Sequence, residues 1–264
     1  MLLRHSRARK RRRHRGPPAS TNEPVRPDTA VGRLTTCTLL PAVPWRSRRS
    51  VVAVPAEALI VALLGAALGF GADRLSARWP VHEDDAIRGM DWRTAVVVLS
   101  SAAAFGALAS RWTEPQDLVV LGVYVGALIV LLATDLDQKL LPDLITLPLI
   151  GYTAAVTLLG LNPLVADKEL GLVSAFAAAL VAPALLYVTD RIFKGALGMG
   201  DLKLAVSLGL MSGLSRLFVG FLAATTLFAA VVLVLIVTRR VTLKTAVPFG
   251  PALIGAGIIA ALLP

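Results

Sequence analysis

Residues 118–134 read LVVLGVYVGALIVLLAT, and this stretch decides the fold class because it contains no charged side chain. An α-helix needs about 20 mostly apolar residues, and no fewer than ~17, to cross the hydrocarbon core of a bilayer. Similar apolar runs recur on both sides of it, and 56% of the 264 residues are hydrophobic, with a mean hydropathy of +0.71. Because a soluble domain is only ~45–50% apolar, the sequence predicts an integral membrane protein.

The apolar runs also predict the number of helices. We expect an all-α, polytopic membrane protein of about eight (seven to eight) transmembrane helices, at 56–72, 94–110, 118–134, 144–161, 170–189, 201–214, 217–238 and 246–263. The sixth range is short for a span, so we expect it to be sunk into the bundle or to cross only part of the membrane. Small residues, as in SSAAAFGALAS at 100–110, would let neighbouring helices approach closely.

The first 50 residues differ from the rest of the chain in charge. They hold 13 of the 27 Lys and Arg residues and two acids, which gives +11, whereas the remaining residues sum to −1. Dense like charge, four prolines by position 30 and the lack of apolar periodicity predict a disordered Arg-rich tail. We therefore divide the chain into this tail at 1–50, N-terminal helices at 51–117 and a membrane core at 118–264.

The tail has three interpretations. In the first it binds anionic lipid headgroups, at about 1 kcal/mol per basic residue near the membrane. In the second it binds nucleic acid, which we do not expect because aromatic residues are not interleaved with the basic ones. In the third, residues 1–50 are not part of the native protein, which then begins near Val51.

The distribution of Lys and Arg between the loops predicts the orientation in the membrane, since cytoplasmic loops are enriched in basic residues. If the first helix starts outside, the inner loops carry eleven basic residues and the outer loops carry three. The eleven are Arg74, Arg78, Arg88, Arg93, Lys139, Arg191, Lys194, Lys203, Arg239, Arg240 and Lys244, and the three are Arg111, Lys168 and Arg216. We expect a multi-pass protein of the inner or plasma membrane. A tail of +11 on the outside opposes this rule, so we expect the tail to be absent rather than the helix count to be wrong by one.

Two acidic clusters lie at the ends of predicted helices, where ionisable groups are costly and mark functional sites. One is DLDQKLLPD at 135–143, and the other is GMGDLK at 198–203. An even number of predicted crossings separates the clusters, so both fall on the inner side of the membrane. Two carboxylates from distant parts of the sequence could therefore meet there.

Paired carboxylates suit peptide hydrolysis, and other protease chemistries lack their residues here. Cys37 is the only cysteine, His82-Glu83 is not followed by the second histidine of a zinc protease, and the apolar runs contain no histidine for a serine triad. In an aspartate pair, one carboxylate takes a proton from water while the other, protonated, hydrogen-bonds the scissile carbonyl. Like charges a few ångströms apart do not both ionise cheaply, so the pair shares one proton.

Residues beside the aspartates fit such a site. Gly198 and Gly200 lack a Cβ, so the backbone can run close to a substrate strand or to a facing helix. We expect Asp201 to cap the sixth helix, where the helix dipole favours its ionised form, and Lys203 to balance the local negative charge.

The acids also have ordinary structural interpretations. Pro142 is expected to end one segment and Asp143 to be the N-cap of the fourth helix. Asp137 is expected to be a solvated acid in a loop, and Asp201 taken alone would be a simple N-cap. The Gly-x-Gly-Asp motif therefore gains its significance from Asp135, which we expect on the same side of the membrane.

The order of these motifs resembles the prepilin peptidases, which are membrane aspartyl proteases of the Gly-x-Gly-Asp type. Asp135 is followed by Pro142-Asp143 and then by GMGDLKL at 198–204, and VPFGP at 247–251 resembles the late Pro-Phe-Gly-Pro turn of the family. The match extends from about residue 118 to the end of the chain. The three motifs together are specific, whereas no single one is.

This resemblance implies that Asp135 and Asp201 are the catalytic pair of an aspartic-type endopeptidase whose active site faces the cytoplasm. The implied substrates are type IV prepilins or pseudopilins, cut after the glycine that ends a short basic leader and precedes an apolar helix. Many members also methylate the new N-terminus with S-adenosylmethionine, and these carry a larger cytoplasmic domain, usually with two CxxC pairs. Here residues 73–93 form a short loop without cysteine, which argues against zinc and against methyltransferase activity.

Three other interpretations stay open. A presenilin-like or signal-peptide-peptidase-like protease would share the PAL sequence at 251–253, but its first aspartate follows a tyrosine, whereas Asp135 follows Thr134. A transporter with functional carboxylates would place acids at helix centres, and the predicted helices have none there. A non-catalytic membrane subunit of pilus assembly would not need both aspartates.

Overall fold

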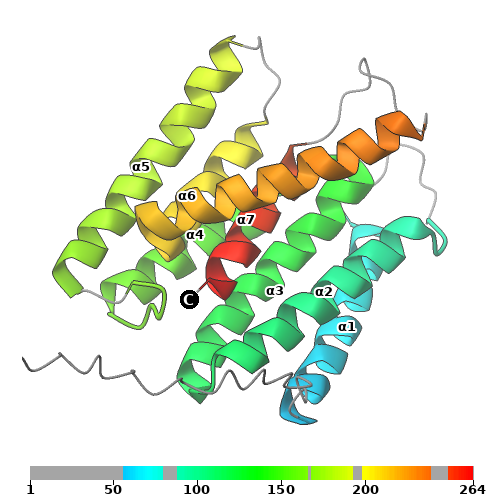
Figure 1. Cartoon of the computed structure of the whole chain (residues 1–264), viewed down its shortest axis with the longest axis horizontal. Coiled ribbons are helices and arrows are strands. Elements are labelled where there is room, and N and C mark those ends of the chain that lie inside the picture. The colour runs from blue at the N-terminus through cyan, green and yellow to red at the C-terminus, as the bar shows by residue number, and fades with distance from the viewer. Residues whose placement is uncertain (1–55, 80–87, 166–167, 193–197, 239–248, 264) are drawn as a thin grey trace, which may run out of the picture. The chain divides into compact units, whose positions relative to one another are not determined.

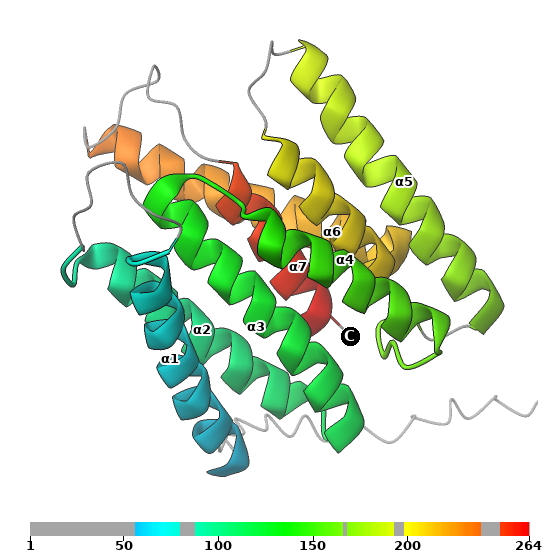
Figure 2. The same ribbon diagram turned by 180° about the vertical axis from the view of Figure 1, so that it is seen from behind.

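The computed structural model describes residues 56–79, 88–165, 168–192, 198–238 and 249–263. The predicted disordered tail at 1–50 lies outside these residues. Within them all regular structure is helical, as Figures 1 and 2 show, so the expected all-α fold class is confirmed for the described part of the chain. The helices are α1 Ala56–Ser76, α2 Trp92–Arg111, α3 Pro115–Gln138, α4 Asp143–Leu158, α5 Lys168–Ile192, α6 Met199–Val237 and α7 Gly250–Leu262.

Five of these helices are long and apolar enough to cross a membrane, which is fewer than the expected seven to eight spans. The five are α1, α2, α3, most of α5 and most of α6. α4 and α7 are apolar but shorter, with 16 and 13 residues. The prediction was too high because apolar composition alone does not set where a helix begins: α7 starts at Gly250, four residues later than expected.

α6 joins the two helices that were expected at 201–214 and 217–238. The element bends sharply at Gly213, whose φ of 65° and ψ of 176° are not helical. A positive φ is readily adopted only by glycine, and Ser174 of α5 accepts a hydrogen bond from the backbone N–H of Leu214 at 2.9 Å. Figure 1 shows the two segments of α6 running in different directions from this bend.

Local sequence signals set the ends of the helices that matter for the site. The Asp91 side chain accepts hydrogen bonds from the backbone N–H groups of Arg93 and Thr94, which caps the start of α2. Pro115 begins α3, where its missing N–H costs nothing. α3 ends at Gln138 because Lys139 adopts the left-handed conformation, with φ of 55°.

The core is built around α3, the most extensively buried of the long helices. Its buried side chains include Leu121, Tyr124, Leu128 and Leu131. α3 packs against α1, α2, α4 and α7, while α6 packs against α4, α5 and α7. α4 and α7 therefore each contact both α3 and α6, which places these two long helices on opposite sides of a shared pair of short ones (Figure 2).

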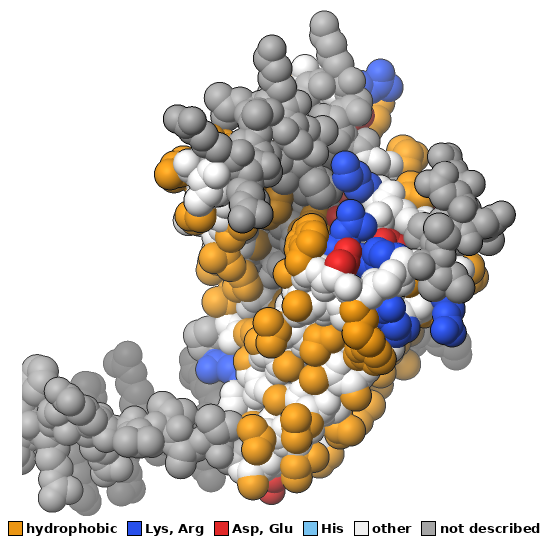
Figure 3. Space-filling view, turned by 90° about the vertical axis from the view of Figure 1, so that its right-hand side faces the viewer, with side chains coloured by type: hydrophobic (Ala, Val, Ile, Leu, Met, Phe, Trp, Pro, Cys, Tyr) orange, Lys and Arg blue, Asp and Glu red, His pale blue; other side chains and the backbone are white. Residues whose placement is uncertain are grey.

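The outer surface of the helices is strongly apolar. Many large aliphatic side chains are exposed, among them Leu63, Leu99, Leu170, Leu180 and Val234. Figure 3 shows such side chains spread over one face of the molecule, with a group of Lys, Arg, Asp and Glu side chains gathered in its upper part. Exposed apolar side chains on long helices are expected where lipid rather than water is the solvent.

Candidate active site

Asp135 and Asp201 are both buried at helix ends. Asp135 occupies the last turn of α3, one residue beyond the expected end of that helix, and Asp201 occupies the first turn of α6. Their residues are 5% and 9% exposed. Both acids therefore lie where the polar backbone ends of two helices meet the apolar interior.

The structure brings these two acids together. Asp135 lies within electrostatic range of Asp201 and, with a smaller effect, of Lys139. The helices that carry them are held by α4 and α7, each of which packs against both. Among the described residues, neither acid forms an ion pair with Lys or Arg, and Oδ2 of Asp135 is buried without a hydrogen-bond partner.

The Gly-x-Gly-Asp motif forms the start of α6. Gly198 is the N-cap, and its backbone N–H donates a hydrogen bond to Oδ2 of Asp201 at 3.2 Å. The backbone N–H of Asp201 in turn donates to the Gly198 carbonyl at 3.1 Å. Asp201 is thus the third residue of the helix, and the expectation that it is the N-cap was wrong. From this position its carboxylate still accepts a hydrogen bond from the backbone N–H of the N-cap, Gly198.

Gly200 allows the segment between α3 and α4 to lie directly on α6. A Cβ at Gly200 would be 2.7 Å from the Cβ of Leu141 and 3.1 Å from its carbonyl oxygen. Contacts this short are not tolerated, so any side chain here would push the two segments apart. The glycine therefore fixes the separation between the two acid-bearing segments, as the sequence suggested for a close approach.

Gly250 fulfils a similar role for Asp135. A Cβ at Gly250 would lie 2.5–2.8 Å from the three carboxyl atoms of Asp135. The first residue of α7 is therefore in contact with the carboxyl group of α3. The Pro-Phe-Gly-Pro turn was predicted only as a motif, whereas in the structure its glycine contacts the Asp135 carboxyl group.

Lys203, Asp143 and Pro142 lie at the edge of the site. Nζ of Lys203 donates to Oδ1 of Asp143 at 2.6 Å, so Lys203 neutralises Asp143 rather than either buried acid. Pro142 is the N-cap of α4 and Asp143 is its first residue, with no side-chain cap hydrogen bond, so the expected N-cap role of Asp143 was wrong. The pair joins the first turn of α4 to the first turn of α6.

A second group of buried acids lies beside the first and was missed. Asp137 was expected to be solvated, but its side chain is only 3% exposed. Its Oδ1 accepts a hydrogen bond from Nη1 of Arg93 at 3.1 Å and lies 3.3 Å from Nη1 of Arg88. Arg88 also pairs with Asp73, which is buried and further paired with Arg74.

Thr94 completes this network through a 2.9 Å hydrogen bond from its hydroxyl to Oδ2 of Asp73. The contacts join the end of α1, the start of α2 and the end of α3. A signal for the network existed in the sequence, because Asp73, Arg74, Arg88 and Arg93 all lie near the ends of predicted helices. The pairing of Arg88 and Arg93 with Asp137, which follows them by more than forty residues, has no local signature in the sequence.

Comparisons with known proteins identify the family of this region. Residues 122–238 match the type IV leader peptidase family. A prepilin leader peptidase/N-methyltransferase of Aeromonas hydrophila is 32% identical over 189 residues, which cover 71% of this chain and 59% of the relative. The protein of the same name from Pseudomonas putida is 31% identical and covers 72% and 60%, and that from Bacillus subtilis (strain 168) is 29% identical and covers 62% and 63%.

The chain spans about three-fifths of the length of these curated relatives. No solved structure gives a significant match. The matched region contains both Asp135 and Asp201 together with the Gly-x-Gly-Asp motif. Residues 122–238 are therefore similar to the type IV leader peptidase family.

Proposed function

We propose that the chain is a membrane-embedded aspartic endopeptidase that removes the leader peptide of type IV prepilins or pseudopilins. One observation carries the proposal: Asp135 and Asp201 are buried, Asp135 lies within electrostatic range of Asp201, and neither acid forms a salt bridge with Lys or Arg among the described residues. Burying a carboxyl group without a cation is costly, so a chemical role explains why the fold keeps two. The relatives named prepilin leader peptidase supply the substrate class.

The chemistry follows from the two acids sharing one proton. The ionised carboxylate accepts a proton from a water molecule as the water oxygen attacks the scissile carbonyl carbon. The protonated carboxyl group donates a hydrogen bond to the carbonyl oxygen, which stabilises the developing negative charge. A proton then passes to the leaving nitrogen as the carbon–nitrogen bond breaks. The pair titrates as a unit, so neither role is assigned to one residue.

The surroundings support this use of the acids. Glycines at positions 200 and 250 bring backbone, rather than side chains, against the acid-bearing segments. The acid-bearing segments are thus closely packed, which suits the positioning of a peptide bond between two carboxyl groups. Lys203 and Asp143 form a salt bridge with each other at the rim, and neither buried acid forms a salt bridge among the described residues.

We further propose that the site faces the cytoplasm. This orientation is supported by the expected distribution of basic loop residues, with eleven on the inner side and three on the outer side. The ends of α3 and α6 that carry the aspartates are on the basic side in that arrangement. Five apolar helices are long enough to make the protein multi-pass. We propose peptidase activity alone, because residues 73–93 contain no cysteine to form the CxxC pairs that the resemblance links to methylation.

The proposal is tested by co-expressing the chain with a prepilin from the same genome and following loss of the leader by gel shift. Asp135→Asn and Asp201→Asn should each lower the cleavage rate by at least ~10³-fold, because each carboxyl group has a role that the other does not fill. Asp117→Asn is the matched control, since Asp117 lies in the first turn of α3, at the other end of the helix from Asp135.

Membrane insertion of each variant is checked by fractionation, so that loss of activity is separated from loss of protein. Cleavage by Asp201→Asn at the wild-type rate would exclude the aspartic mechanism. Failure of the wild-type chain to cleave any prepilin or pseudopilin of its genome would exclude the substrate class.

A further inference from the structure

The last turn of α3 presents acids on two opposite faces. Asp135 and Asp137 are two residues apart, and at about 3.6 residues per turn their side chains point about 200° apart around the helix axis. Asp135 contacts Gly250 of α7 and lies within electrostatic range of Asp201 of α6. Asp137 contacts Arg93, near the start of α2. The arginine therefore holds the side of the turn that is directed away from the proposed catalytic pair.

This turn is the part of α3 that the helix itself supports least. The last four carbonyl groups of an α-helix lack the full set of N–H partners, so the final turn frays more easily than the rest. The backbone N–H of Lys139 donates to the Asp135 carbonyl at 2.9 Å, and Lys139 then leaves the helix in the left-handed conformation. Helix resumes only at Asp143. Contacts from outside α3 are therefore needed to keep an acid in this turn in one direction.

Arg93 supplies such contacts through one nitrogen atom. Its Nη1 donates a 3.1 Å hydrogen bond to Oδ1 of Asp137 and a 3.3 Å hydrogen bond to the backbone carbonyl oxygen of the same residue. The second bond pairs a carbonyl group that the end of the helix leaves open. Nη1 of Arg88 lies 3.3 Å from the same Oδ1 but forms no hydrogen bond among the described residues, so Arg88 contributes charge. Arg93 thus holds both the side chain and the backbone of the turn.

Arg93 is itself held in place by the start of α2. Its backbone N–H donates a 3.0 Å hydrogen bond to the side chain of Asp91, the N-cap of that helix. Its guanidinium group lies over the ring of Trp92, with the central carbon 5.9 Å from the ring centroid. A hydrogen bond from a guanidinium group to a carboxylate is also roughly twice as strong as one between neutral groups. The first turn of α2 is therefore a support from which Arg93 holds the end of α3.

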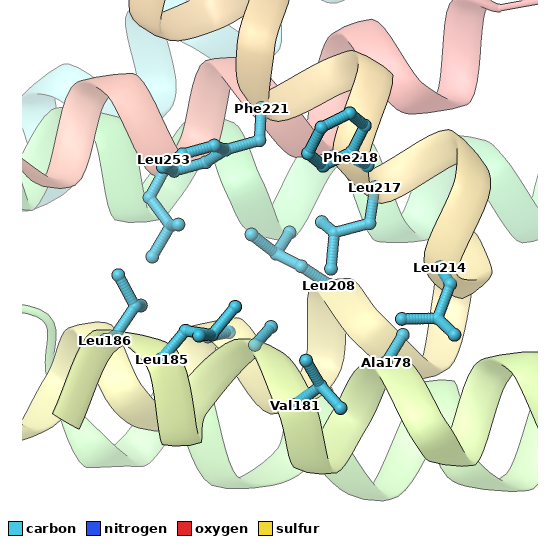
Figure 4. Close-up of a pocket in the computed structure, with 12 residues that line it drawn as sticks. Ala178, Val181, Leu185, Leu186, Leu208, Leu214, Leu217, Phe218, Phe221 and Leu253 are labelled. Atoms are coloured by element: carbon cyan, nitrogen blue, oxygen red, sulfur yellow. The ribbon is translucent and has the colours of Figure 1, made fainter. Parts of the chain in front are cut away.

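The other acid-bearing helix is positioned by packing. The start of α6 lies directly on Leu141, a contact that Gly200 permits. Further along, α6 borders an apolar cavity of about 170 Å³ between α5, α6 and α7, and Figure 4 shows Leu208 and Leu217 of α6 pointing into it. Neither Arg93 nor its partners line this cavity. A side chain shortened there would loosen packing without changing the contacts of Arg93.

We propose that Arg93 is a positioning residue for the proposed catalytic pair: by holding Asp137 from α2, it fixes the direction in which Asp135 faces Asp201. The inference rests on the proposed peptidase function and adds to it a residue that acts on catalysis through another. A displacement of ~1 Å is enough to lower a catalytic rate by up to ~10²-fold. Loss of the contact should therefore lower kcat and leave KM nearly unchanged, because correct alignment of the acids matters in the transition state.

The first measurement determines kcat, KM and melting temperature of purified variants in detergent, with a prepilin as substrate. Arg93→Met removes the donor but keeps a long side chain, and it should lower kcat by about 10-fold while KM changes less than ~3-fold. Arg93→Lys keeps a cation that can donate hydrogen bonds, so it should recover part of the loss. If Arg93→Met does not fold, Arg93→Gln replaces it.

Asp73→Asn is the matched control within the same network. It breaks the ion pairs of Asp73 with Arg74 and Arg88 but removes no contact of Arg93. It should lower the melting temperature more than Arg93→Met does, yet change kcat less than ~3-fold. Leu217→Ala enlarges the cavity and should likewise lower the melting temperature without lowering kcat.

The order of the two effects distinguishes positioning from general support. If kcat falls in proportion to the melting temperature across Arg93→Met, Asp73→Asn and Leu217→Ala, Arg93 only stabilises the fold and the proposal is wrong. A wild-type kcat in folded Arg93→Met would overturn it as well. A low kcat in Arg93→Met beside a near-normal kcat in the less stable Asp73→Asn would support it.

A double-mutant cycle tests whether Arg93 acts through Asp137. Asp137→Ala should lower kcat about as much as Arg93→Met, because each variant removes the same contact. The double variant should then lose no more than the larger of the two single effects. If the two effects multiply instead, Arg93 acts independently of Asp137 and the proposal is wrong.

The second measurement does not depend on cleavage. Amide hydrogen exchange at residues 136–139 should be at least ~10-fold faster in Arg93→Met than in wild type, because the last turn of α3 opens more often. Asp73→Asn should accelerate exchange at the end of α1 instead. Equal exchange at 136–139 in wild type and Arg93→Met would overturn the proposal. If the wild-type protein cleaves no prepilin, the peptidase function itself has failed, whatever the exchange result.

Discussion

Asp137 and Asp135 are separated by one residue on α3, yet their environments are opposite. Asp137 contacts two arginines, and through Arg88 it belongs to the network that also holds Asp73. Asp135 is also buried, but it forms no salt bridge among the described residues and its Oδ2 has no hydrogen-bond partner. The first arrangement neutralises a carboxylate and ties three helices together; the second is the one that we propose for proton exchange. The contrast separates acids that hold the fold from acids that we propose to perform chemistry.

Among the variants that keep both acids, Gly200→Val has the largest expected effect. Gly200→Val should lower cleavage at least ~100-fold, because a Cβ would collide with Leu141 and shift Asp201 relative to Asp135. Cleavage of a co-expressed prepilin measures it. Gly151→Val is the control, since a Cβ at Gly151 of α4 has no atom within 4 Å. Wild-type cleavage by the Gly200 variant would show that the glycine is incidental to the site.

Much of the acid site could be predicted from sequence because its signals are local. Apolar runs give the helices, and Gly-x-Gly-Asp marks a helix start with a close approach. The role of Asp137 could not be predicted in this way. Its partners Arg88 and Arg93 precede it by more than forty residues, and a carboxylate after an apolar run looks the same whether it meets water or arginine. The contact of Gly250 with Asp135 is equally remote in sequence.

Asp73→Asn should produce the largest loss of stability. Asp73 is buried and paired with Arg74 and Arg88, so its neutralisation removes the counter-charge of Arg74 and one of the counter-charges of Arg88. We expect a loss of about 2–3 kcal/mol, below the ~3–5 kcal/mol of fully buried pairs because both arginines are partly exposed. Thermal unfolding in detergent measures the effect. A melting temperature equal to that of wild type would show that the network contributes no stability.

Asp137→Asn should have a smaller effect of the same sign. Its distances to Arg88 and Arg93 are 3.3 and 3.1 Å, and an asparagine oxygen can still accept from Arg93. We expect a loss of about 1–2 kcal/mol, measured as above. A solvated acid, as the sequence suggested, would give a change close to zero. The Arg93→Gln variant should reproduce part of the loss, because it removes one of the same contacts.

The smallest expected change in stability is that of Asp135→Asn, and its sign is opposite. The wild-type carboxyl group is buried without a salt bridge, and Oδ2 has no hydrogen-bond partner among the described residues. A neutral amide of nearly the same size removes the cost of burying a charge and breaks no ion pair, so the free energy of unfolding should stay equal or rise by up to ~1 kcal/mol.

The comparison of Asp135→Asn with Asp137→Asn is internally matched, because both replace an aspartate in the last turn of one helix. A fall in the melting temperature for Asp137→Asn and none for Asp135→Asn, with cleavage abolished only in the latter, would separate the two classes of acid in one experiment. If Asp135→Asn instead destabilised the protein as much as Asp137→Asn, Asp135 would be part of the supporting network. Its missing cation would then no longer be evidence of a catalytic role, because a carboxyl group that stabilises its fold needs no other reason to be kept.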